Sequence, residues 1–196
     1  MKRLLLLLLT LAFAGPAWAE RGALSLSRNI DQLTSRSAVI LRGTVLSAHV
    51  EKHPVLTGLD TVVVRMRVRE TLKGRPGATY TFRQYIWDIR DRFDAAGYRK
   101  GQDYLLMMIA PSDYGLSSPA GLAQGRFRIL RDRTGKELAV NGHANLRLFD
   151  GVSAQLAKEG ISLSPKSSKL LASHHVGLVD LRELTDLVRE LAQRNP

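Results

Sequence analysis

The chain has 196 residues, contains no cysteine and carries a formal net charge of +11 at pH 7. This length is sufficient for one domain with a substantial hydrophobic core, and the lack of cysteine excludes disulfide bonds, thiolate catalysis and cysteine-ligated metals within this chain. The excess of basic residues favours anionic partners such as lipid headgroups, acidic polysaccharide, nucleic acid or an acidic protein face.

Residues 1–19 have the pattern of a secretory signal peptide, because two basic residues precede an apolar stretch over residues 4–14 and small residues follow. Cleavage is predicted between Ala19 and Glu20, which leaves a formal charge of +9. The apolar stretch is too short to remain as a membrane-spanning helix, and no later stretch is long enough. We therefore predict a periplasmic or secreted protein without an integral membrane segment after cleavage.

Residues 20–37 are predicted to form a short helix, with Ser27 or Asn29 as its N-cap. The apolar residues Leu26, Ile30 and Leu33 are spaced so that they would lie on one face of this helix.

Two long strands are predicted next. The first covers residues 38–51, in which Gly43 marks a bulge or a sharp bend. The second includes residues 62–69, in which apolar and arginine residues alternate, so that one face is apolar and the other is basic. The basic face carries Arg65, Arg67 and Arg69.

Residues 78–87 form the following predicted strand, joined to its predecessor as a hairpin by a glycine- and proline-containing turn. A polar segment then leads to residues 104–110, whose continuous apolar run predicts a strand that is buried on both faces. One face of the predicted strand at residues 78–87 carries Arg83, Tyr85 and Trp87.

Residues 111–125 are rich in glycine, proline and serine and are predicted to form a long loop. Structureless loops of this length are uncommon inside compact domains and are often functional. A second hairpin is expected up to residue 142, followed by a surface excursion over residues 150–178. Residues 179–193 have the capping signal and the apolar spacing of an amphipathic helix.

These elements predict a mainly β protein with a single domain over residues 20–196. Five to six strands are expected to close into a small OB-like barrel over about residues 37–142, because closure removes exposed strand edges. The short N-terminal helix and the C-terminal amphipathic helix would flank this barrel.

Four short motifs lie along the predicted strands. They are an apolar-apolar-x-Gly-x-Val stretch at residues 39–45, a Leu-Lys-Gly strand end at residues 72–74, a Gly-x-x-Tyr-Leu-Leu stretch at residues 101–106 and a Gly-x-x-x-Gly-x-Phe stretch at residues 121–127. Together they resemble the OB-fold domain of the tissue inhibitors of metalloproteinases and the netrin-like modules. They resemble even more the uncharacterised exported bacterial proteins that share this pattern. The resemblance covers about residues 37–133 and implies an OB-like barrel.

The chain departs from that family at the inhibitory site. The animal inhibitors chelate the protease zinc through an N-terminal cysteine, whereas the expected first residue here is Glu20 and the chain has no cysteine. The resemblance therefore implies docking on a protein partner at most, and not this inhibitory mechanism.

The arginines of the second strand are candidate ligands for a row of phosphates or carboxylates, because alternate strand residues stand about 6.6 Å apart. OB folds often bind polymers on a sheet face that combines basic residues with aromatic platforms, and Arg83, Tyr85 and Trp87 would complete such a surface. The alternative is a solvated outer face whose arginines pair with nearby carboxylates such as Glu70 or Asp60.

Other kinds of site have little support in the sequence. His49 and His53 are four residues apart in a strand-to-loop context, and His174 with His175 lacks an evident third ligand, so no metal site is predicted. Glycine loops for nucleotides and the Gly-x-Ser-x-Gly motif are absent. We therefore predict no cofactor and no enzymatic activity.

The leading hypothesis is an exported, non-enzymatic binding module that engages a protein partner through the barrel rim and loop 111–125, with Tyr114, Leu116 and Leu122 as contact residues. The alternative is polyanion binding through the basic strand face, with polysaccharide, lipid headgroups or nucleic acid as ligand. An unrecognised hydrolase is the third hypothesis. The first two differ in salt dependence, because phosphate-type binding weakens steeply with salt and an apolar protein interface does not.

Overall fold

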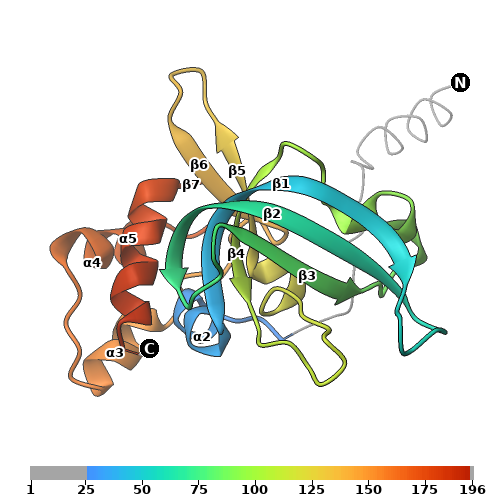
Figure 1. The fold of residues 1–196 in the computed structure, drawn as a ribbon. Helices are drawn as coiled ribbons and strands as arrows, with labels where there is room; N and C mark the ends of the chain where they lie inside the picture. Colours follow the sequence, from blue (N-terminus) through green and yellow to red (C-terminus); the bar gives the residue numbers. More distant parts are fainter. Residues whose placement is uncertain (1–25, 195–196) are drawn as a thin grey trace, which may run out of the picture.

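The computed structural model describes residues 26–194, so the predicted signal peptide and its cleavage site lie outside the described residues. Within them the chain forms one antiparallel sheet with helices gathered on one side (Figure 1). The strands are β1 (Val39–Lys52), β2 (Asp60–Lys73), β3 (Thr79–Tyr85), β4 (Asp103–Met108), β5 (Arg126–Arg131), β6 (Glu137–Asn141) and β7 (Val179–Asp180). The helices are α2 (Ile30–Arg36), α3 (Val152–Lys158), α4 (Pro165–Ser173) and α5 (Leu181–Ala192), with the 3-10 turns η1 (Ile89–Arg92), η2 (Ala95–Gly97) and η3 (Leu122–Gln124).

The sheet has seven strands in the order β3-β2-β1-β4-β5-β6-β7, and each neighbouring pair is antiparallel. The prediction of a mainly β protein is confirmed. A closed barrel of five to six strands is not confirmed, because this sheet is open, with β3 and β7 at its edges. The edge of β3 is partly covered by the loop after β4, where Leu116 forms a parallel bridge with Arg83 and the Ser117 N–H donates to the Arg83 carbonyl at 2.8 Å.

The strands β1 and β2 are each 14 residues long and curve across the molecule (Figure 1). Their register shifts at three places along β1, and such bulges increase bending and twist. One shift lies between Arg42 and Gly43, where an added Cβ would stand 2.6 Å from the carbonyl oxygen of Arg67. The predicted bulge at Gly43 is therefore confirmed, and glycine is required because the β2 backbone comes so close.

Two apolar cores lie on opposite faces of the sheet, as the alternation along β4 shows. The helix-side core lies between the sheet and the helices, whereas the concave core fills the inside of the curve made by β1, β2 and β3. In β4 the helix-side core contains Leu105 and Met107, and the concave core contains Tyr104, Leu106 and Met108.

The two predicted terminal helices are confirmed with shorter bounds, but Leu26, which was predicted on the apolar face of the first, lies before α2 and is 82% exposed. α2 begins after Asn29, whose side chain accepts from the Gln32 N–H at 3.0 Å while the Gln32 side chain accepts from the Asn29 N–H at 3.1 Å. α5 begins after Asp180, whose carboxylate accepts from the Glu183 N–H at 3.0 Å. Its apolar stripe is fully buried in the helix-side core, through Leu184, Leu187, Val188 and Leu191.

Residues 150–178 differ from the predicted surface excursion. They contain α3 and α4, and they add Val152, Leu156, Leu170 and Leu171 to the helix-side core. The serine- and lysine-rich run is the start of α4, where Ser164 caps the helix and Pro165 occupies its first turn. The mixed polarity arises because each short helix buries only one side.

Candidate functional site

Three connecting segments lie at the end of the sheet where β1 ends and β2 begins (Figure 1). They are the β1–β2 turn at residues 53–59, the segment after β3 at residues 86–97, and the outer part of the loop after β4 at residues 110–118. We call these three segments the loop rim.

Strand register brings the three segments together. Tyr85 at the end of β3 pairs with Thr61 at the start of β2, and the next N–H, that of Ile86, donates to the Asp60 carbonyl at 3.1 Å. The segment after β3 therefore leaves the sheet beside the β1–β2 turn. The third segment joins them through Leu116, which bridges to β3.

His53 fastens two of these segments from a buried position, with 1% of its surface exposed. Its Nδ1 accepts the N–H groups of Val55 at 3.2 Å and Leu56 at 2.9 Å, and its Nε2 lies 2.9 Å from the carbonyl oxygen of Tyr114. Since Nδ1 faces two donors and Nε2 faces an acceptor, this network fits the neutral tautomer with its proton on Nε2. The outer loop is thus held onto the β1–β2 turn.

Asp60 fastens the remaining segment. Its carboxylate lies 2.9 Å from Lys52 Nζ and 3.1 Å from Arg92 Nε. The hydrogen bond from Lys52, together with the nearby charge of Arg92, lowers the pKa of Asp60 below its ordinary value. This carboxylate keeps η1 against the start of β2.

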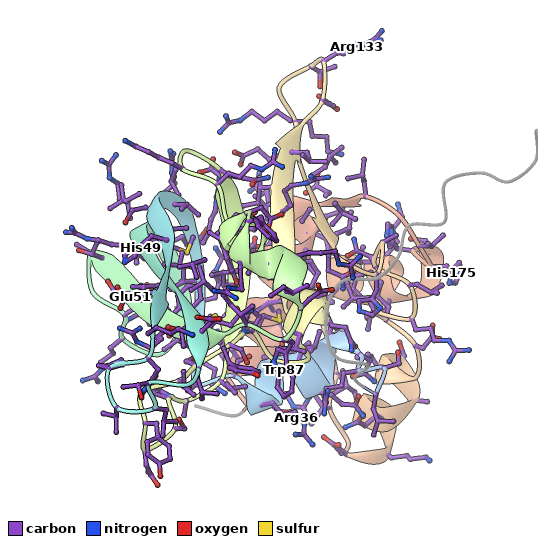
Figure 2. All side chains as sticks on the ribbon, turned by 90° about the vertical axis from the view of Figure 1, so that its right-hand side faces the viewer. Arg36, His49, Glu51, Trp87, Arg133 and His175 are labelled. Atoms are coloured by element: carbon purple, nitrogen blue, oxygen red, sulfur yellow. The ribbon has the colours of Figure 1, made fainter. Side chains whose placement is uncertain are left out.

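Large apolar side chains are exposed on all three segments. Among them, Trp87 packs edge to face against the ring of Tyr85, with 4.9 Å between the ring centroids. Figure 2 views this side of the molecule and shows Trp87 there. The exposed fractions are 70% for Val55, 59% for Trp87, 62% for Ile89, 86% for Phe93 and 56% for Tyr114.

The predicted contact residues of loop 111–125 separate into two groups. Tyr114 is exposed on the loop rim, and Leu116 is half-buried against β3. Leu122 instead begins η3, where the neighbouring Ala123 carbonyl accepts from the Gly142 N–H after β6. The inner part of the loop is therefore packed into the fold, with Pro119, Ala120, Gln124 and Gly125 buried.

The predicted arginine row lies on the outer face of β2, and all three side chains are exposed. Arg69 donates from Nε to Thr44 Oγ1 at 2.7 Å and lies 3.8 Å from Asp103. Within the described part of the chain, the guanidinium groups of Arg65 and Arg67 form no hydrogen bond or ion pair. The row is neither covered by α5 nor fully paired with carboxylates.

Arg83 differs from the rest of the predicted basic surface, because its guanidinium group is held within the fold. It donates to Glu51 at 2.6 Å and to Thr61 at 2.9 Å. The hydrogen bonds from Arg83 and His49 lower the pKa of Glu51 below its ordinary value. Arg83 therefore has a structural partner, and Trp87 belongs to the loop rim rather than to the arginine row.

Several rim residues are not among the contact residues predicted from the sequence. Ile89 and Phe93 were read as part of a polar segment, although two large apolar residues among so many charges were a signal of exposure. His53 was examined as a metal ligand and instead holds two loops. In residues 26–194 no cluster of three or more histidine or acidic side chains has the arrangement of a metal site.

Residues 26–194 contain no helix with the length and apolar character needed to cross a membrane. Comparison of the chain with models of known protein families, with curated proteins and with solved structures finds no match. The resemblance to metalloproteinase inhibitors therefore stays a prediction, as do the exported location and the absence of enzymatic activity.

Proposed function

We propose that this protein is an exported, non-enzymatic binding module that docks a partner protein on the loop rim. The observation that carries the proposal is the exposure of Val55, Trp87, Ile89, Phe93 and Tyr114 on three segments that hydrogen bonds and ion pairs hold together.

Large apolar side chains that gather on one part of a protein surface commonly mark an interaction site. Tryptophan and tyrosine are also enriched among the residues that dominate binding energy, because they bury a large area and lose little side-chain entropy. The anchors beneath them, His53 and Asp60, reduce the ordering cost of binding, because the loops are already held in place.

The partner chemistry follows from the charges of the rim. Arg90 pairs with Asp88, and Arg92 pairs with Asp60, so the rim charges near the apolar residues are largely compensated locally. The chain after the predicted cleavage nevertheless carries a formal charge of +9. The partner expected is a folded protein with an apolar hollow bordered by acidic residues, which the basic protein would attract over a longer range.

The same proposal includes an OB-like module as the scaffold of the rim. It is supported by the bent pair β1 and β2, by the bulge at Gly43 and by the loop that covers the edge of β3. The resemblance to inhibitor modules adds the expectation of protein docking.

The test uses a photo-crosslinking amino acid introduced at Phe93 or Tyr114 on the rim, and at the exposed control positions Leu146 or Val176. Both rim positions should form an adduct with the same protein in the producing cell, and the control positions should not. With that purified partner, Trp87→Ala should weaken binding about 30-fold or more, whereas Val176→Ala should not change it.

Salt gives the second readout, because an apolar interface should lose little affinity between about 50 and 200 mM salt. Adducts that form equally at rim and control positions would contradict the proposal. An adduct with a second copy of this chain would show that the rim mediates self-association and does not dock a different protein.

A further inference from the structure

The outer face of β1, β2 and β3 has an arrangement that rim docking does not use. On this face the two unpaired arginines stand between hydroxyl-bearing residues of the neighbouring strands. Arg65 pairs in register with Ser47 on β1 and with Thr81 on β3. Arg67 pairs in register with Thr44 on β1 and with Thr79 on β3.

Both ends of this face are electrically compensated. At one end Arg69 stands beside Asp103, which also accepts from Thr44 Oγ1 at 2.5 Å. At the other end Arg83 is bound by Glu51. The uncompensated positive charge is therefore concentrated at the centre of the face, on Arg65 and Arg67.

The central guanidinium groups are available to a ligand. Their side chains are exposed, and the helices gather over the other part of the sheet (Figure 1). Alternate strand residues stand about 6.6 Å apart, so the two groups can bind successive anionic groups of one extended chain. Carboxylate, sulfate and phosphate oxygens are strong acceptors for guanidinium donors.

We propose that this face binds an anionic polysaccharide. Arg65 and Arg67 bind its carboxylate or sulfate groups, and the hydroxyl groups of Ser47, Thr79 and Thr81 exchange hydrogen bonds with sugar hydroxyls. This site is separate from the loop rim and is independent of the proposed protein docking.

The composition of the face distinguishes a polysaccharide from other polyanions. Single-stranded nucleic acid is bound by basic grooves with aromatic platforms between the charges, and here Tyr85 and Trp87 lie at one end and pack on each other. An anionic membrane would favour exposed apolar side chains for insertion beside the charges. The residues flanking Arg65 and Arg67 carry hydroxyl groups instead.

The experiment measures binding of the protein to immobilised dextran sulfate and alginate, with neutral dextran as a blank. The double variant Arg65→Gln/Arg67→Gln is compared with the matched control Arg133→Gln/Arg147→Gln, which removes the same charge from exposed positions on the β5–β6 turn and after β6. Figure 2 shows Arg133 at the tip of its turn.

The wild type and the control variant should bind at about 50 mM salt and lose roughly ten-fold in affinity by about 200 mM, as expected for about two ionic contacts. The Arg65/Arg67 variant should bind roughly ten-fold more weakly at low salt and show a shallower salt dependence. Arg69→Gln should have a smaller effect, because Asp103 already compensates that charge. Trp87→Ala should bind like the wild type.

Equal losses in the test and control variants would overturn the proposal, because net charge alone would then explain binding. Retention of full binding by the Arg65/Arg67 variant would also overturn it. Tighter binding to single-stranded DNA or to phosphatidylglycerol vesicles than to either polysaccharide would overturn the proposal, because the ligand would then be a nucleic acid or a lipid surface. Unchanged thermal unfolding of the variants would show that a loss of binding is not a loss of fold.

Discussion

The long strand β1 has different neighbours in its two halves. Near its start, Ile40 faces the helix-side core and Leu41 faces the concave core, and neither has exposed surface. Further along, Ala48 and Val50 still pack against the concave core, whereas His49 is exposed. The same strand is buried on both faces in one half and on one face in the other.

Helix coverage therefore decides which part of the sheet has a solvent-exposed outer face. Where α2 and α5 lie over the sheet, most of the side chains that face them are apolar, and a charged residue such as Arg42 is paired, because burying an unpaired charge is costly. Beyond the helices, β2 can carry Arg65 and Arg67 on its outer face, because water solvates them. Four measurements test this difference between the covered and the open part of the sheet.

The largest effect is expected in the covered half. Leu187→Ala should lower the free energy of unfolding by about 2–5 kcal/mol, because Leu187 is fully buried under the sheet and its loss leaves a cavity. Urea denaturation measures this change. Leu178→Ala is the control, because Leu178 is 47% exposed and should cost far less. A similar, small loss of stability at both positions would contradict the burial of Leu187 between α5 and the sheet.

A smaller effect is expected at the loop rim of the open half. His53→Ala should cost about 1–3 kcal/mol, because the N–H groups of Val55 and Leu56 lose their buried acceptor. Hydrogen exchange at those two amides should become faster. His49→Ala removes an exposed histidine from the same strand region and should change neither quantity appreciably. Equal effects of the two variants would show that His53 is not an anchor.

The third effect is a pH dependence in the helical region. Burial opposes ionisation of Glu190, but hydrogen bonds from the Ser164 hydroxyl and N–H and from the Ser167 hydroxyl outweigh it, so its pKa lies below the ordinary 4.5. The stabilisation is complete above the ordinary value and is lost as the pH falls through the lowered one.

Glu190→Gln should remove this dependence. The wild type should lose about 1 kcal/mol more than the variant between about pH 6 and pH 3, after allowance for solvent screening. Urea denaturation across that range measures the difference. Identical pH profiles would show that Glu190 does not stabilise the contact between α4 and α5.

The smallest effect on stability is expected on the basic face. Arg65→Gln/Arg67→Gln should change the free energy of unfolding by less than about 0.5 kcal/mol, because neither guanidinium group has a partner in the described fold. Thermal unfolding checks this. A large loss would mean that these arginines stabilise the sheet and are not free for a ligand.

Local pattern was sufficient for several parts of the fold. Alternation along β2 correctly separated its buried apolar face from its exposed arginines, because the side-chain period of a strand is two residues. Capping residues likewise identified the starts of α2 and α5, and apolar spacing identified the buried stripe of α5. These features depend on neighbours within a few residues, so the sequence determined them by itself.

Long-range contacts decided the remainder. Arg83 was predicted to extend the arginine row. Its guanidinium group is instead bound by Glu51, 32 residues away in the sequence, so it is not free for a ligand. Residues 150–178 were read as a surface excursion, but their leucines are buried because α3 and α4 meet the rest of the helix-side core. The loop rim joins residues that are far apart in the sequence, such as His53 and Tyr114, which are 61 positions apart. Such contacts depend on how the chain folds back on itself, and the tertiary structure alone determines them.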